Sequence, residues 1–136
     1  MRRFLAFSGV DPAALSVNKK SWNPNHLPKE VRKAQDDLVI ELKQALTTQE
    51  SHPDWEAGWI DDTETFTVEM EFGFRSTNSD VDSPIKRVLD ALEMALVAKG
   101  YDWNDRKVYD LIVSKYIDPI PTLMVILYPL DPEEPE

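Results

Sequence analysis

Three aspartates and a lysine are the residues of this chain whose types and spacing could do chemistry. Asp80, Asp82 and Lys86 lie within seven residues, and Asp105 follows the apolar-periodic segment that they open. Carboxylate oxygens suit Mg²⁺, which usually takes only a few of them and leaves positions for water and substrate phosphate. The set therefore suffices for a magnesium site of the kind that cuts phosphodiesters. It is not unique to nucleases, because Asp and Glu make up 25 of the 136 residues.

The segment after Asp82 has the pattern of an amphipathic helix, which we expect over residues 83–99. Asp82 or Ser83 can cap it, Pro84 fits its first turn, and Gly100 suits the left-handed residue that ends a helix. The expected apolar stripe consists of Ile85, Leu89, Leu92 and Leu96. The opposite face carries Asp82, Lys86, Asp90 and Glu93 at spacings of four, four and three. These four charged side chains should therefore lie on one face of the helix.

Strand and helix patterns alternate along the rest of the chain. A first helix is expected over 29–48, after a long loop that follows the first strand. The expected strands cover 3–8, 63–74, 108–117 and 123–130. We expect the last two strands to form an antiparallel pair. The order β-α-β-α-β-β predicts an α/β (α+β) fold with a mixed sheet and two main helices.

Composition limits the class of protein. With 136 residues, 42% of them apolar, the chain can form one domain with a real core, which we place at 1–130 before an acidic, disordered tail at 131–136. The absence of cysteine excludes disulfides and thiolate metal sites and suits a reducing cytoplasm. No segment approaches the roughly 20 apolar residues of a membrane span, so we expect no membrane partner.

The charge distribution is asymmetric. A net charge of −10 argues against nucleic-acid binding, because Lys and Arg contacts to phosphate supply most non-specific affinity. Residues 1–33, however, carry seven Lys or Arg and two acids, which leaves the large excess of acids in residues 34–136. The basic segment could meet a phosphate backbone, or it could be an ordinary solvated surface. Both interpretations stay open at this stage.

The order of these motifs resembles the RusA family of Holliday junction resolvases (crossover junction endodeoxyribonucleases) over nearly the whole chain. The family pattern D-x-D-N-x-x-K at a strand-to-helix junction is similar to Asp80-Val81-Asp82-Ser83-Pro84-Ile85-Lys86. The pattern continues through Asp90-Ala91-Leu92, Gly100-Tyr101, Asn104-Asp105 and Val108. An N-terminal loop of the family is similar to Leu15-Ser16-Val17-Asn18-Lys19-Lys20.

The resemblance implies a small α/β homodimer that resolves branched DNA, such as four-way junctions, in recombination and repair, and a phage or prophage origin. It implies Mg²⁺ as the cofactor, with Mn²⁺ as a substitute, held by Asp80, Asp82 and Asp105. It gives Lys86 the role of an assisting base or a cation that stabilises the transition state. The positive groups that we expect nearest this cluster, and therefore in contact with DNA, are Lys19, Lys20, Arg75 and Arg87.

The chain departs from the family pattern at several positions. Ser83 stands where the family has asparagine, and Asn104 replaces the first acid of an Asp-Asp pair. The segment before Asp105 is about four residues longer than in the family pattern. Where relatives place several arginines ahead of the first catalytic aspartate, this chain has only Arg75. The metal site is therefore expected to be retained with fewer cations to hold DNA.

Structural explanations exist for each residue taken alone. Asp82 could be only a helix cap with Lys86 as its i, i+4 partner, an exposed pair worth roughly 0.3–0.5 kcal/mol. Asp105 could be an ordinary acid in a turn, and Trp103 could pack in the core or line the site. Two other functions also remain open. The chain could be a catalytically idle relative that binds a basic protein, or a nuclease that cuts flaps and forks.

Overall fold

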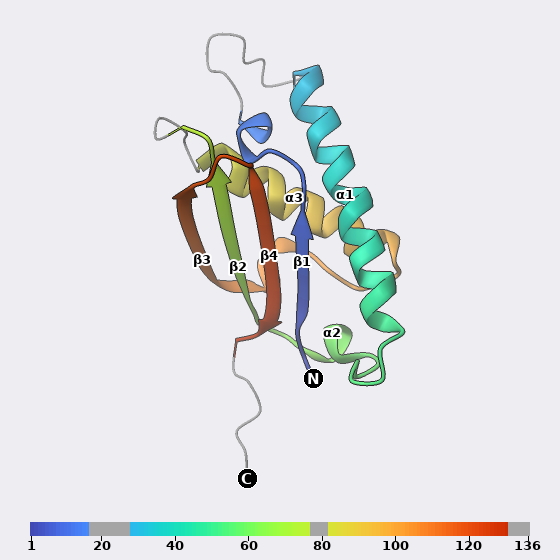
Figure 1. Cartoon of the computed structure of the whole chain (residues 1–136). Coiled ribbons are helices and arrows are strands. Elements are labelled where there is room, and N and C mark those ends of the chain that lie inside the picture. Colours follow the sequence, from blue (N-terminus) through green and yellow to red (C-terminus); the bar gives the residue numbers. More distant parts are fainter. Residues whose placement is uncertain (17–27, 77–81, 131–136) are drawn as a thin grey trace.

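The computed structural model describes residues 1–16, 28–76 and 82–130, apart from the side chains of Asp82 and Ser83. The chain forms a four-stranded mixed sheet with its two long helices on one face (Figure 1). The strands are β1 (Phe4–Ser8), β2 (Phe66–Phe74), β3 (Val108–Ile117) and β4 (Thr122–Pro129). The α-helices are α1 (Lys29–Glu50), α2 (Trp59–Asp62) and α3 (Asp82–Ala98), and two 3-10 helices are η1 (Pro12–Leu15) and η2 (Asp105–Lys107).

The mixed sheet and the two main helices are confirmed. Helix α1 continues two residues beyond the expected end, to Glu50. The Gln49 side chain explains this extension, because it bonds to both backbone groups of Leu5 in β1, with distances of 3.0 Å to the N–H and 2.6 Å to the carbonyl. The short helix α2 was not expected from the sequence, and its four residues delay the start of β2 to Phe66.

The expected antiparallel pair of 108–117 with 123–130 is wrong. The strand order is β1-β4-β2-β3, so β2 lies between β3 and β4. Strand β2 pairs in parallel with β3 and antiparallel with β4. Pro119 and Pro121, which lie between β3 and β4, lack the N–H groups that a tight hairpin needs. The segment between the two strands instead passes the end of β2, where the Asp118 N–H donates to the Phe74 carbonyl at 2.8 Å. Strand β2, the most completely buried of the four strands, thereby takes an interior position.

The core lies between the sheet and helices α1 and α3. Alternate residues of β2 are buried on that side, and the buried ring of Phe66 is contacted by two tryptophans. Ring centroids are 6.1 Å apart for Trp59–Phe66 and 4.8 Å apart for Phe66–Trp103. Burial of three aromatic side chains supplies a large share of the hydrophobic stabilisation at this end of the sheet.

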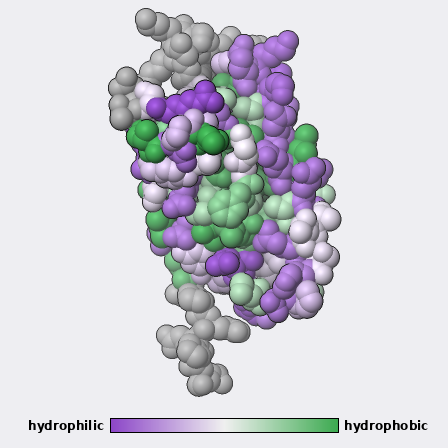
Figure 2. Space-filling model, in the orientation of Figure 1, coloured by the Kyte–Doolittle hydropathy of each residue, from purple (hydrophilic) through white to green (hydrophobic). Residues whose placement is uncertain are grey.

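The other face of the sheet is covered by none of the described helices. Figure 2 shows hydrophobic surface gathered over the middle of this face. The residues that alternate with the buried ones point this way, among them Phe7 of β1, which is 73% exposed. Among the described residues, no helix has the length and hydropathy needed to span a membrane.

Gly73 of β2 provides a test of this packing. Its neighbours across the ladder are Tyr116 and Thr122, whose hydroxyl groups bond to each other over the glycine. A Cβ at this position would overlap Thr122 Oγ1 and come within 2.9 Å of Tyr116 Cε2. We expect Gly73→Ala to lower the free energy of unfolding by about 1–3 kcal/mol. Gly9→Ala is the control, since its Cβ would meet nothing closer than 4.0 Å, and equal urea midpoints for the two variants would contradict the packing.

Candidate acidic site on helix α3

Of the four charged residues that the sequence assigned to one face of helix α3, the structure describes the side chains of Lys86, Asp90 and Glu93, and none of these three is buried. Lys86 is exposed, and Asp90 lies one turn further along the helix. The Asp90 carboxylate is 3.7 Å from the Arg87 guanidinium, in an i, i+3 ion pair. Helix α3 begins at Asp82, one residue before the expected start at 83, so Asp82 is itself a helical residue. Asp80 lies outside the described residues.

Asp105 lies in the segment that returns from the end of α3 to the start of β3. It is the first residue of η2, and the side chain of Asn104 caps this short helix by accepting a hydrogen bond from the Arg106 N–H at 2.9 Å. An amide oxygen and a carboxylate oxygen both serve this role. Asn104 therefore gives the cap that an acid at this position would also give, and it orients the following residue.

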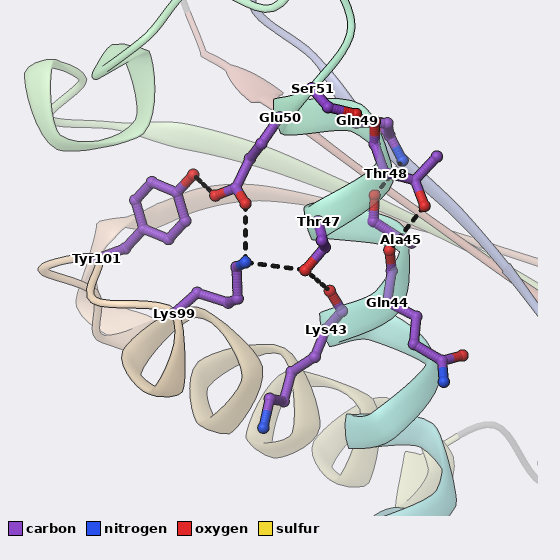
Figure 3. A network of polar contacts seen from close by, with 10 residues as sticks. All are labelled: Lys43, Gln44, Ala45, Thr47, Thr48, Gln49, Glu50, Ser51, Lys99 and Tyr101. Atoms are coloured by element: carbon purple, nitrogen blue, oxygen red, sulfur yellow. Dashed lines mark hydrogen bonds and ion pairs between the residues drawn. The ribbon is translucent and has the colours of Figure 1, made fainter.

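The return segment is held to helix α1 by a polar network (Figure 3). Gly100 ends α3 with φ of 94°, the left-handed conformation that the sequence predicted. On either side of it, the Tyr101 hydroxyl donates to Glu50, and Lys99 Nζ lies 2.8 Å from another oxygen of Glu50 and 2.8 Å from Thr47 Oγ1. One carboxylate of α1 thus fixes both residues that flank the turn.

Further contacts fix the chain just before Asp105. Trp103 is only 5% exposed and packs on Phe66, so it belongs to the core and does not line a site. The backbone N–H of Asp102 donates to Asp61 at 3.0 Å, and Lys107 Nζ donates to the Asp102 carbonyl at 2.6 Å. The backbone on both sides of Asp105 is therefore anchored, although its own side chain is exposed.

The electrostatics of Asp105 connect it to the middle of α3. Burial of part of the group raises the pKa of its carboxyl, and the negative charges of Glu93 and then Asp90 raise it further. At a rise of 1.5 Å per residue, Glu93 lies about 16 Å along the helix from Asp82. The structure thus associates Asp105 with the helical acids beyond Asp82. Convergence of Asp80, Asp82 and Asp105 on one ion stays a prediction.

Two observations define what this arrangement can hold. Within the described ranges, no three Asp, Glu or His side chains converge as a ready metal site. Asp90, Glu93 and Asp105 nevertheless place oxygen donors around one side of α3, with only Arg87 as a described ion-pair partner among them. The sequence placed Asp90 and Glu93 on the right helical face, but gave them no role beside Asp105 because the return path of the chain was unknown.

The cations expected to contact DNA are placed unevenly. Arg75 is exposed just after the end of β2. Arg87 has a side chain that is only 12% exposed and is paired with Asp90, which leaves little of its guanidinium available to a phosphate. Lys19 and Lys20 lie outside the described residues.

Comparison with known proteins gives no assignment. No protein-family model matches the sequence, and no curated protein matches it. The function must therefore be argued from the residues of this chain.

The Tyr101–Glu50 bond predicts a pH-dependent stability. Burial, the hydrogen bond to Glu50 and the nearby negative charges raise the pKa of Tyr101 above its ordinary value of about 10. Its neutral form is favoured in the folded state, so the stabilisation is complete below pH 10 and is lost as the pH rises through the raised pKa. At pH 7, Tyr101→Phe should cost about 1 kcal/mol in urea denaturation. Above pH 10 the difference from the parent should shrink.

Tyr109→Phe is the matched control, because Tyr109 is 69% exposed. This variant should unfold like the parent protein at pH 7. If Tyr101→Phe is as stable as Tyr109→Phe at pH 7, the anchoring of the return segment by Glu50 is wrong.

Proposed function

We propose that this protein is a magnesium-dependent, structure-specific endodeoxyribonuclease that resolves four-way or related branched DNA. Asp80, Asp82 and Asp105 are assigned to metal binding, and Lys86 to the stabilisation of charge at the scissile phosphate. The family resemblance supplies the reaction. The observation in the structure that supports it is the group of carboxylates on α3 near Asp105. Partial burial raises the pKa of Asp105 most, and the negative charges of Glu93 and Asp90 raise it further.

The residues fit a hard divalent cation. A carboxylate whose pKa is raised by other carboxylates lies in negative potential, and a bound cation relieves that repulsion. All the available donors are oxygens, which Mg²⁺ and Mn²⁺ accept, and the chain contains no cysteine to favour softer metals. When bound, Mg²⁺ would supply a Lewis acid that activates water and neutralises charge on the phosphate.

The protein's own residues then have distinct tasks. The carboxylates hold the cation and repel phosphate in its absence, so cation binding should precede productive DNA binding. The exposed ammonium of Lys86, one turn beyond Asp82, can meet the negative charge that develops on the phosphate. Exposed Arg75, after β2, is placed to contact a neighbouring phosphate. Two opposed cuts in a four-way junction need two such sites, which a two-fold homodimer provides.

An acidic protein-binding module is the alternative function. It is favoured by the carboxylates of Glu69 and Glu71 in β2, which alternate with the core residues and so belong to the face of the sheet that no described helix covers. Such a face could dock a basic protein. The three functions can be separated with a synthetic four-way junction, a flap and a fork, each incubated with Mg²⁺ or with EDTA. A resolvase cuts the junction in Mg²⁺, a broader nuclease also cuts the flap and the fork, and a binding module cuts none of them.

Metal binding can be tested without activity. We expect Mg²⁺ to raise the melting temperature of the parent protein by roughly 4 °C when its concentration is tenfold above the dissociation constant. Asp105→Asn should abolish this shift, because it removes a charged ligand of the proposed site. Asp102→Asn should keep it, since the Asp102 side chain in the same segment is 92% exposed. Equal shifts in both variants would exclude Asp105 as a ligand.

Catalysis is tested by Asp82→Asn. Asn caps a helix as well as Asp does, so the fold and its stability should survive. Junction cleavage in Mg²⁺ should fall by a factor of at least roughly 100, while junction binding persists or tightens because one negative charge is gone. Cleavage at the parent rate would remove this cluster from the mechanism and favour the acidic binding module.

A further inference from the structure

The two edges of the sheet are treated differently. At the β1 edge, the side chain of Gln49 bonds to both the N–H and the carbonyl of Leu5. At the end of the same strand, Glu41 accepts from the N–H of Gly9 at 3.2 Å and from the Ser8 hydroxyl at 2.8 Å. Helix α1 therefore occupies both backbone groups of Leu5 and the N–H of Gly9 on this edge, which hinders another strand from pairing there.

Strand β3 forms the opposite edge and is exposed on both of its faces. It has ten residues and contains no proline, and within the part of the chain that the structure describes it pairs only with β2. The exposed fractions are 69% for Tyr109, 39% for Leu111, 40% for Ile112, 40% for Tyr116 and 50% for Ile117. A long apolar edge strand without proline is a template for pairing with another strand, and soluble proteins normally protect such an edge.

We infer that β3 is the interface at which a second copy of this chain pairs, antiparallel and across a two-fold axis, to form a continuous eight-stranded sheet. This inference assigns the surface of the homodimer and rests on the dimer that the proposed function includes. The strand pairing itself requires no catalytic activity.

Charge favours a second copy at this strand. Each chain has a net charge of −10, so most of its surface repels another copy. Residues 107–118 are an exception, because Lys107 and Lys115 balance Asp110 and Asp118. Antiparallel pairing also separates the two copies of Asp110 from each other and the two copies of Lys115 from each other. A parallel pair would instead align like charges.

The exposed area is sufficient. A fully exposed large apolar or aromatic side chain presents roughly 200 Å², so the partly exposed apolar residues of β3, together with Ile120 at 73%, present roughly 600 Å². This equals the upper range of the largest apolar patch on a typical monomer. With the backbone edge and polar neighbours added, it approaches the roughly 800 Å² per partner of a standard interface.

Sheet geometry limits the register. Residues that face each other in an antiparallel pair point to the same face of the sheet. Because side chains alternate between faces along the strand, and a two-fold axis perpendicular to the sheet keeps each face on its own side, the two numbers of each pair are both even or both odd, and their sum is even. An axis at Ile112 pairs Tyr109 with Lys115 and Asp110 with Ser114 of the second copy. An axis at Val113 pairs Leu111 with Lys115. The first axis places Ile112 at the centre of the interface, and the second places it one residue from the centre.

The test is the mass in solution, measured by light scattering at micromolar concentration. The parent protein should have twice the chain mass of 15.6 kDa. Ile112→Lys should shift the mass to 15.6 kDa, because it places like charges near each other at the axis and weakens the dimer by at least about tenfold. An equimolar mixture of Ile112→Lys and Ile112→Glu should recover the dimer. Unchanged circular dichroism shows that each variant is folded.

Phe7→Lys is the matched control, since Phe7 is 73% exposed on the other edge strand. This variant should remain a dimer if the copies pair through β3. If the copies instead packed through the uncovered face of the sheet, Phe7→Lys would dissociate them. Because the chain has no cysteine, a single cysteine at 112 or at 113 should give a disulfide-linked dimer on oxidation. A parent mass of 15.6 kDa, a dimer that survives Ile112→Lys, or an assembly that grows with concentration would each overturn the inference. Junction cleavage is measured separately, so loss of cleavage alone does not affect it.

Discussion

The packing of Trp103 on Phe66 is the contact on which the rest of the arrangement depends. The chain leaves α3 far from β2 and must return across the core before it can pair in parallel with that strand. The buried indole fixes the point of return. It determines where β3 begins and where Asp105 lies relative to α3. The Glu50 network then fixes the turn at Gly100, so one core contact and one carboxylate of α1 together position an otherwise exposed acid.

Negative charge is concentrated on the side of α3 near Asp105, where the proposed cation would bind. It is balanced by lysines along β3, where the second copy is proposed to pair. On the side of α3 near Asp105, partial burial raises the pKa of the Asp105 carboxyl, and the negative charges of Glu93 and Asp90 raise it further, a perturbation that clusters at functional sites. Strand β3 shows the opposite composition, with equal numbers of acids and lysines among exposed apolar residues. The average charge of −10 conceals both features, because it is a property of the whole chain and these are local.

Residue spacing within a segment predicted the helices and turns that form within that segment. The apolar periodicity and the left-handed Gly100 were readable from residue spacing, and both ends of the two long helices fall within two residues of the positions that these signals predicted. The sequence could not reveal that β2 lies between β3 and β4, because strand order depends on which strands are most completely buried. It also could not place Asp105 beside Asp90 and Glu93, since that depends on the packing of Trp103. Helix α2 was missed because four residues carry too little periodicity.

The position of β3 also limits how two sites could serve one junction. A two-fold axis perpendicular to a continuous sheet keeps the α3 helices of both copies on the same face, so two acidic sites would face one DNA molecule. A dimer packed through the uncovered sheet faces would instead point its two α3 helices away from each other. Only the edge arrangement combines a covered apolar strand with two sites accessible from one side. The exposed edge and the two cuts that the proposed resolvase activity would require, although argued from different residues, therefore favour the same assembly.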